Sequence, residues 1–385
     1  MDETHLIEGT RSWSELAGRL EGRRVLVRSD LNKPYEARLE AELPSYRFVR
    51  NNGGRLWIMS HCGRYGEDAE SLAYAKKPVE DALGCEVILF PDYEEAAHAD
   101  LGKGRVGLLE NTRLRPEDEA GDLNYARALA ASGDVVVING ASVCHRPHAS
   151  VTGILEYMPG FAGPLVETEH YKISRFSGKP AGHAVAAVGG AKLKEKMKLL
   201  AHLAGNGYVA VPGGLPLNNV LLARGLKVGK SKTEEEGKNY VDKAEALLSD
   251  EDVAARLRLP KDVVCTLADL TDPLEFPVSQ IPDDRMVVDI VPDYFDDDMA
   301  VAQMALLVGP LGLYEKGYKR GTEHFVGRMP KNSLIFGADT AKSMKGVPYC
   351  GVISLGGGSG AELLSGKEWV AVDKLRENAK KFKFP

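Results

Sequence analysis

Cysteine is scarce in this chain of 385 residues, and no two cysteines form a Cys-x-x-Cys pair. The five cysteines are scattered and odd in number, which is typical of reduced thiols and argues against a zinc site. Long hydrophobic runs are also missing, since none approaches the ~18 apolar residues that suggest a membrane span. The first residues, MDETHLIEGTRSWSEL, lack the apolar core of a signal peptide. We therefore expect a soluble, cytoplasmic protein with no membrane partner.

Basic residues do not outnumber acidic ones. The chain has 49 lysines and arginines against 55 aspartates and glutamates, a formal net charge of −6. This balance argues against a general nucleic-acid binder, so any anion site must be a local concentration of basic residues. The 44% hydrophobic and 27% charged fractions are ordinary for a globular protein. At this length two domains are predicted, because one hydrophobic core rarely supports so many residues.

Short apolar runs alternate with longer amphipathic segments along the chain. Such alternation indicates βαβ units and parallel sheets covered by helices on both faces. The Gly/Pro-containing segment RFSGKPAG, 175–182, is interpreted as the join between two lobes, with enough runs on each side for one sheet per lobe. The expected strands are 24–27, 56–59, 86–89, 106–109, 134–138, 183–188, 208–211, 263–267, 286–290, 305–308, 334–336 and 351–355, and the clearest helical segments are 45–51, 77–83, 124–131 and 241–248.

A phosphate-binding turn is predicted in AVAAVGGAKLKEK, residues 184–196. The apolar run ends in Gly189 and Gly190, and the helix-forming segment that follows carries Lys192 and Lys196 on one face. Cations in a first helical turn oppose the helix dipole, so this arrangement favours a bound anion at the helix N-terminus. A solvated, lysine-rich surface helix remains an alternative from these residues alone.

Four basic segments in the N-terminal half each follow an apolar run. Ligands of open parallel sheets bind outside the carboxyl ends of the strands, so these side chains are expected to converge on one rim. One loop arginine alone is usually solvated or salt-bridged, but the repetition favours a small, highly anionic ligand bound by arginine forks. The segments are VLVRSDLNKP (25–34) followed by Arg38, MSHCGR (59–64) with His61 and Arg64, LLENTRLRP (108–116) with Arg113 and Arg115, and NGASVCHRPHAS (139–150) with His145, Arg146 and His148.

These segments, in this order and spacing, resemble phosphoglycerate kinase. The likeness covers roughly residues 10–375 and rests on RVLVRSDLN, MSHCGR, LLENTRLRPEDE, CHRPHAS, VGGAKLKEK, GPLGLYE, GADTA and SLGGGSGAELL. It implies an α/β fold of two Rossmann-like lobes, each a parallel sheet flanked by helices, joined by a hinge. The N-terminal lobe, 1–174, would bind phosphoglycerate and the C-terminal lobe, 175–370, the nucleotide. The C-terminal segment, 371–385, is expected to return to the N-terminal lobe.

The resemblance also implies an activity and its residues. The reaction is reversible, Mg²⁺-dependent phosphoryl transfer between 1,3-bisphosphoglycerate and ADP, giving 3-phosphoglycerate and ATP after hinge closure, in a monomer acting in glycolysis or gluconeogenesis. Such transfer needs in-line positioning and charge neutralisation more than a nucleophilic side chain. The implied acid-binding residues are Asp30, Asn32, Arg38, His61, Arg64, Arg113 and Arg146. The implied catalytic residues are Arg38, Lys192, Lys196, Gly357 and Gly358. The implied nucleotide-binding residues are Lys196, Gly213, Gly214, Gly309, Pro310, Glu315, Asp339 and Thr340, with Asp339 also at the metal.

Several residues depart from the family pattern, mostly near the implied nucleotide site. Val308 stands where asparagine is usual and Pro212 where a glycine run begins. These changes leave open whether ATP or GTP is preferred, and they motivate an alternative: a diverged protein that binds or senses a phosphorylated acid. The other departures are Ala338 and Val291 for glycine, and Gly140 and Ser142 for aspartate and phenylalanine.

Three further patterns have simpler explanations. Gly356, Gly358 and Ala361 fit G-x-G-x-x-A, but the short segment before Gly366 leaves too little room for a dinucleotide-binding crossover. GLKVGKS, 225–231, has three residues between its glycines where a P-loop has four, and is expected to be a loop. The acidic cluster 293–298 lacks ligand spacing and is expected to be a solvated helix start.

Overall fold

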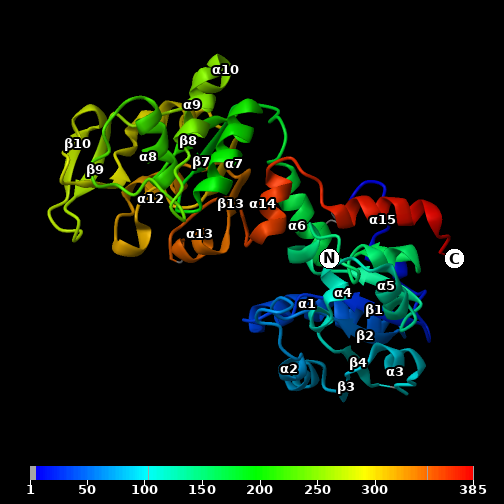
Figure 1. The fold of residues 1–385 in the computed structure, drawn as a ribbon. Coiled ribbons are helices and arrows are strands. Elements are labelled where there is room, and N and C mark those ends of the chain that lie inside the picture. The colour runs from blue at the N-terminus through cyan, green and yellow to red at the C-terminus, as the bar shows by residue number, and fades with distance from the viewer. Residues whose placement is uncertain (1–5, 103, 345, 385) are drawn as a thin grey trace. The chain divides into compact units, whose positions relative to one another are not determined.

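The structure is a computed structural model that describes residues 6–102, 104–344 and 346–384, without the side chain of Asp339. The chain forms two compact units, Met1–Tyr171 with Glu368–Pro385, and Lys172–Lys367 (Figure 1). These bounds lie within a few residues of the expected 174/175 join. Residues 368–370, which the sequence assigned to the second lobe, belong to the first unit. The reason is local packing, since Glu368 and Trp369 both contact His170.

The first unit is built on a six-stranded parallel sheet with the order β3-β4-β2-β1-β5-β6. Every strand in it except β6 coincides, within a residue or so at either end, with an apolar run that the sequence predicted to be a strand. Pairing is in register along the centre, with Val25 opposite Leu56 and Val135. The strands are β1 (Arg24–Arg28), β2 (Arg55–Met59), β3 (Val87–Phe90), β4 (Val106–Leu109), β5 (Val135–Ile138) and β6 (Gly160–Ala162).

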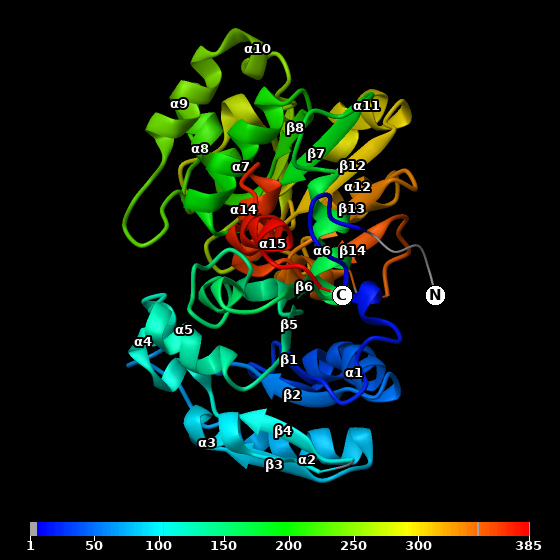
Figure 2. The ribbon, with the colours of Figure 1, turned by 90° about the vertical axis from the view of Figure 1, so that its right-hand side faces the viewer.

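Helices cover this sheet and bury an apolar core that includes Val27, Ile58, Val106 and Phe161. At one edge β3 and β4 lie side by side, with α2 and α3 next to them (Figure 2). The last helix, α15, packs against β6, so the chain's C-terminal segment completes the first unit. The helices are α1 (Glu36–Asn51), α2 (Ala73–Leu83), α3 (Tyr93–His98), α4 (Pro116–Glu119), α5 (Leu123–Ala130), α6 (Pro164–Ser174), which runs into the second unit, and α15 (Val370–Lys381).

The second unit contains two sheets, so the expectation of one sheet per lobe is wrong here. Its five-stranded parallel sheet has the order β14-β13-β12-β7-β8, and a separate three-stranded antiparallel sheet has the order β10-β9-β11. The runs 263–267 and 286–290 form β9 and β11, and a short, largely exposed strand, β10, pairs with β9. The strands are β7 (Ala184–Val188), β8 (Val209–Pro212), β9 (Asp262–Thr266), β10 (Leu274–Pro277), β11 (Met286–Ile290), β12 (Met304–Val308), β13 (Ser333–Phe336) and β14 (Val352–Ser354).

The helices of the second unit mostly follow the parallel strands. They share one core with both sheets, in which Val185, Val211, Cys265 and Ile290 are all buried. The antiparallel sheet is therefore part of this unit's core. The helices are α7 (Leu193–Gly205), α8 (Gly214–Ala223), α9 (Val241–Ser249), α10 (Glu251–Ala254), α11 (Asp296–Ala300), α12 (Arg320–Val326), α13 (Ala338–Ser343) and α14 (Gly357–Leu364).

The sequence predicted reduced cysteines and no membrane-spanning segment. All five cysteines are described, and each is a free thiol. Among the described residues, we find no helix with the length and apolar character needed to cross a membrane.

Candidate active site

The four basic segments of the first unit follow β1, β2, β4 and β5, which are the four contiguous central strands of the sheet. In a parallel sheet the carboxyl ends of such strands meet at one edge. The segments therefore converge on one rim, as the sequence predicted. We call this edge the cationic rim, defined by Asn32, Arg38, His61, Arg64, Arg113 and Arg146.

Asp30 organises the part of the rim that follows β1. Its Oδ2 accepts hydrogen bonds from Arg38 Nη1 and from Ser142 Oγ, the latter at 2.5 Å. Its Oδ1 accepts from the backbone N–H of Asn32 at 3.1 Å, and Asn32 Oδ1 in turn accepts from Gly63 N at 3.2 Å. Arg38 stays 38% exposed although it is paired, so one end of its guanidinium is held while the side chain remains open to solvent.

His61 is a buried member of the rim and lies against an arginine that the sequence did not single out. Arg28 is fully buried, and its Nη1 donates to Ser29 O at 2.7 Å and approaches His61 Nδ1 at 3.4 Å. Burial lowers the pKa of His61 well below its usual range, and the charges of Arg28, Arg113 and Arg38 lower it further. His61 is therefore a neutral imidazole at pH 7 and adds hydrogen-bonding capacity to the rim without adding charge.

The remaining three arginines differ in exposure. Arg113 is buried, donates to Gly63 O at 2.5 Å and lies 3.4 Å from Glu119; burial, then Arg28 and Arg146, lowers its pKa to about 10. Arg64 is exposed and lies 3.7 Å from Glu67, and Arg146 Nε donates to His145 Nε2 at 3.3 Å. The positive charges of Arg28 and Arg146 act on Arg113, and like charges disfavour one another unless an anion neutralises them. The rim is thus arranged for an anionic ligand.

Sequence reasoning missed Arg28 and Asp118. It named Ser142 only as a departure from the family pattern, and it expected His148 at the rim without assigning it to acid binding. Asp118 Oδ1 accepts from the Ser150 backbone N–H at 2.8 Å, and its Oδ2 lies 4.0 Å from His148 Nδ1. Burial lowers the pKa of His148 to about 4, with the nearby arginines adding to the shift and Asp118 opposing it. A signal was available for Arg28, because it is a charged residue closing a strand that is otherwise buried. No comparable signal marked Asp118.

Four of the five parallel strands of the second unit are followed directly by a glycine. Gly189 follows β7, Gly213 follows β8, Gly309 follows β12 and Gly337 follows β13, and we call this set the glycine edge. A side chain would not fit there, since a Cβ on Gly189 would lie 2.1 Å from Pro310 O and one on Gly213 2.6 Å from Leu311 Cα. The N–H groups of these four glycines donate within the edge itself, to Val308 O, Val188 O, Thr340 Oγ1 and Ser354 O. The glycines therefore serve close backbone packing at the carboxyl end of the sheet, where ligands of parallel sheets bind.

Several implied nucleotide-binding residues meet at the glycine edge. Lys196 Nζ donates to the backbone carbonyl of Val308 at 3.1 Å, and Gly309 N donates to Thr340 Oγ1 at 3.0 Å. Gly214 N donates to Leu311 O at 3.0 Å, next to Pro310. Lys192 is the N-cap residue of α7, so the helix begins one residue after it, and its side chain is exposed. The structure thus brings Lys196, Gly214, Gly309 and Thr340 together at this edge.

A separate glycine cluster lies at the start of α14, which follows β14. Gly356 is the N-cap at φ +61°, and Gly357 and Gly358 form the first turn of this eight-residue helix. A Cβ on Gly356 would lie 2.3 Å from the Phe336 ring, which explains the glycine sterically. α14 ends at Leu364, and no strand follows it among the described residues after β14, as expected if this is not a dinucleotide-binding crossover.

The two other patterns agree with their simpler explanations. Residues 225–231 form the loop between α8 and α9. The acidic cluster contains the start of α11, where Asp296 pairs with His324 and Arg328, and Asp298 with Arg258. Asp296 and Asp298 are thus paired with basic side chains, whereas Asp293 and Asp297 are exposed, as a solvated helix start predicts.

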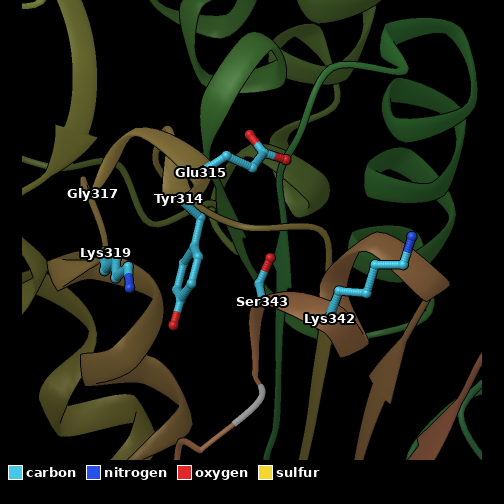
Figure 3. A pocket seen from close by; sticks show the side chains of 6 residues that line it. All are labelled: Tyr314, Glu315, Gly317, Lys319, Lys342 and Ser343. Atoms are coloured by element: carbon cyan, nitrogen blue, oxygen red, sulfur yellow. The ribbon is translucent and has the colours of Figure 1, made fainter.

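Glu315 lies in a cleft of about 470 Å³ in the second unit (Figure 3). The Tyr314 ring lines it with Lys319 on one side, where the Lys319 ammonium lies 4.9 Å from the ring centre. The Tyr314 hydroxyl donates to Glu323 Oε1 at 3.1 Å. The cleft is within the ~300–1,000 Å³ range of ligand pockets. Its lining residues are Tyr314, Glu315, Gly317, Lys319, Lys342 and Ser343.

The metal expectation concerns Asp339, whose side chain lies outside the described part of the structure. Its backbone belongs to the first turn of α13, directly after β13. The described residues contain no group of three His, Cys, Asp or Glu side chains that could hold a metal by themselves. Mg²⁺ that arrives with a nucleotide needs only one or two protein carboxylates, because phosphates and water supply the other ligands.

The two parallel sheets and their edges are typical of an α/β protein that binds phosphorylated ligands, with a cationic rim on one sheet and a glycine edge on the other. The family whose model matches the chain, over residues 16–367, is phosphoglycerate kinase. The chain belongs to the phosphoglycerate kinase family, whose members are phosphotransferases with a carboxyl group as acceptor.

Individual relatives support this membership over nearly the whole chain. The phosphoglycerate kinase of Thermomicrobium roseum is 34% identical, covering 94% of this chain and 98% of the relative. That of Moorella thermoacetica is 32% identical, covering 93% and 97%. The solved phosphoglycerate kinase of Coxiella burnetii matches with a TM-score of 0.84 at 26% identity, over 96% of this chain and 100% of that one. The structure from Pyrococcus horikoshii OT3, at 23% identity, a TM-score of 0.78 and 97% and 100% coverage, supports the fold.

Proposed function

We propose that this chain catalyses reversible, Mg²⁺-dependent phosphoryl transfer between 1,3-bisphosphoglycerate and ADP, giving 3-phosphoglycerate and ATP. The observation that carries the proposal is the cationic rim, where four contiguous strands each deliver basic or hydrogen-bonding side chains. A three-carbon acid with a carboxylate and a phosphate is small and highly anionic, and arginine forks bind both groups. Family membership makes this acid the first candidate.

Within this proposal each set of residues has a role. The cationic rim together with Asp30 binds the acid, and Arg38 neutralises the transferring group from the acid side. Lys192, Lys196 and the N–H groups of Gly357 and Gly358 neutralise it from the nucleotide side, because such transfer depends on charge stabilisation. The nucleotide binds at Gly213, Gly214, Gly309, Pro310, Glu315 and Thr340. Asp339 holds Mg²⁺, which supplies charge neutralisation on the phosphates. We further propose a monomer working in the cytoplasm.

A coupled assay with 3-phosphoglycerate, ATP and Mg²⁺ tests the proposal, repeated with GTP and with EDTA. We expect turnover with Mg²⁺ and its loss with EDTA. The comparison of ATP with GTP reports whether Val308 and Pro212 change the nucleotide preference. Absent turnover with intact binding of 3-phosphoglycerate would overturn the proposed activity in favour of an acid-binding protein.

A further inference from the structure

Glu42 is a buried carboxylate of the first unit that none of the roles above uses. It lies on the face of α1 that packs on the sheet, only 1% exposed, three residues after Leu39 and four before Tyr46. A glutamate is rarely fully buried without a specific partner. A carboxylate buried on this face, beside Leu39, Ser45 and Val49, therefore needs an explanation.

The carboxylate of Glu42 joins the ends of two neighbouring strands. Its Oε1 accepts from the backbone N–H of Asp30, just after β1, at 2.9 Å. Its Oε2 accepts from the side-chain amide of Asn139, just after β5, at 2.6 Å. Each oxygen thus holds one of the two segments that carry acid-site residues. A charged acceptor makes such hydrogen bonds short and strong.

Asp30 and Asn139, the two partners of Glu42, connect it to the cationic rim. The Asp30 carboxylate holds Arg38 and, through Ser142 Oγ at 2.5 Å, the segment that leads to Arg146. Asn139 is fixed in turn, because its Nδ2 also donates to Ser45 Oγ at 3.0 Å. The segments after β1 and β5 are therefore tied together twice, through Glu42 and through Asp30 with Ser142.

Burial of the Glu42 carboxylate disfavours its charged form, and the shifted pKa of Glu42 shows this cost. Burial raises the pKa of Glu42 to about 7, although hydrogen bonds from Asp30, Asn139 and Ser29 oppose the shift. The ionisable groups that face it are the Asp30 carboxylate, whose charge raises the pKa further, Tyr46 from its own helix and Arg28 from β1. An apolar residue would avoid this cost but would leave two buried N–H donors without acceptors. Retaining a glutamate here is consistent with a need for fixed geometry.

We propose that Glu42 is a positioning residue for acid binding, which acts through Asp30 and Asn139 to hold Arg38 and the segment before Arg146 in place. This inference rests on the proposed function of the cationic rim. Binding sites need their side chains held within about 0.5 Å by a second layer of hydrogen bonds. Displacement of reacting groups by about 1 Å can lower turnover by about two orders of magnitude.

The test compares Glu42→Gln with a matched variant, Glu167→Gln. Glu167 is also a buried carboxylate of the first unit, and burial raises its pKa to about 7, but the groups that oppose this shift are Ser12 and Trp13. In Glu42→Gln an amide N–H must face one of the two donors, so one bond is lost. We expect the KM and calorimetric Kd for 3-phosphoglycerate to rise about ten-fold or more. The KM for ATP should stay unchanged, and Glu167→Gln should leave all three constants at wild-type values.

A double-mutant cycle separates positioning from a purely structural role. If Glu42 acts through Arg38, the Glu42→Gln change should add little to the Kd for 3-phosphoglycerate in an Arg38→Ala background, because the group being positioned is gone. A lowered melting temperature with an unchanged Kd in the Glu42→Gln single variant would overturn the proposal. So would a full, additive effect in the Arg38→Ala background.

Two further outcomes are also decisive. If Glu42→Gln does not fold, Glu42→Asp carries the test, because the shorter carboxylate keeps its charge but cannot reach both donors. An unchanged Kd in Glu42→Asp would overturn the proposal. If the wild-type protein neither binds nor turns over 3-phosphoglycerate, the proposed function itself fails and this inference falls with it; wild-type activity with an unaffected Glu42 variant refutes the inference alone.

Discussion

The glycine edge of the second unit depends on Gly189 having no side chain, and Gly189→Ala tests this dependence. A Cβ there would lie 2.1 Å from Pro310 O, 2.8 Å from Pro310 C and 3.3 Å from Leu311 Cα. All three are backbone atoms, so rotation of a side chain cannot relieve the clash. An ordinary contact begins at 3.4 Å, so the segment at Pro310 must retreat by about 1 Å.

The clash at Gly189 sets the expected size of the Gly189→Ala effect on stability and activity. Overpacking of this kind costs about 1–3 kcal/mol of folding free energy. The same shift moves Gly309 and Pro310, which are implied in nucleotide binding, and a 1 Å misplacement can cost about a hundred-fold in rate. We expect the KM for ATP to rise and kcat to fall, together lowering kcat/KM about ten- to hundred-fold. The calorimetric Kd for 3-phosphoglycerate should stay at the wild-type value, because the cationic rim belongs to the other unit.

Gly205→Ala provides the matched control. Gly205 ends α7 in the same unit, and a Cβ there meets nothing within 4 Å. Alanine favours helix by about 0.5–1 kcal/mol over glycine, so this variant should unfold at the same or a higher temperature with wild-type kinetics. Wild-type kinetics and melting temperature in Gly189→Ala would refute the argument that backbone packing at this edge requires glycine.

Three other variants probe separate parts of the molecule. Lys196→Ala should lower kcat by orders of magnitude with little change in acid binding, because its charge matters most in the transition state; equal loss of both, in the coupled assay and by calorimetry, would place Lys196 on the ground-state ligand. Arg146→Ala should chiefly raise the KM for 3-phosphoglycerate, and an unchanged KM would remove it from the site. Burial raises the pKa of Glu167 from 4.5 in the unfolded chain to about 7, so the unfolded chain releases this proton first and stability falls as pH rises through that range. Glu167→Gln removes this loss, because glutamine does not titrate. Between about pH 4.5 and 8, the free energy of unfolding measured in urea should therefore rise in the variant relative to the wild type by up to about 3 kcal/mol. A difference that does not change with pH would contradict the assignment.

The parallel sheets were predictable because their strands are almost wholly buried. Val135–Ile138 and Ala184–Val188 are buried at every position, so they appear in the sequence as continuous apolar runs. β6 was missed because it has only three residues and begins with glycine. β10 was missed because it is largely exposed, so its pattern resembles a loop. The antiparallel pairing of β9 and β11 is a long-range choice that no local pattern in either strand reveals.

The residues of the cationic rim were predictable for a related reason. They follow buried strands directly, and strand order in a parallel sheet brings such positions together. Arg113 shows the limit of this reasoning, since its place after β4 did not reveal that it is buried against Gly63 and Glu119. Whether a loop arginine faces solvent depends on the neighbouring loop, which is distant in sequence.

The turn at Gly189 and Gly190 and the basic segments before it are decided by local sequence, since strand, glycine and helix follow one another within a few residues. Tertiary structure alone decided what those residues touch. Lys196 donates to Val308 across 112 residues, and Glu42 reaches Asn139 across 97. Local propensities select strands, turns and helices, whereas the burial of a charge and the acceptor it finds depend on which distant segments pack together.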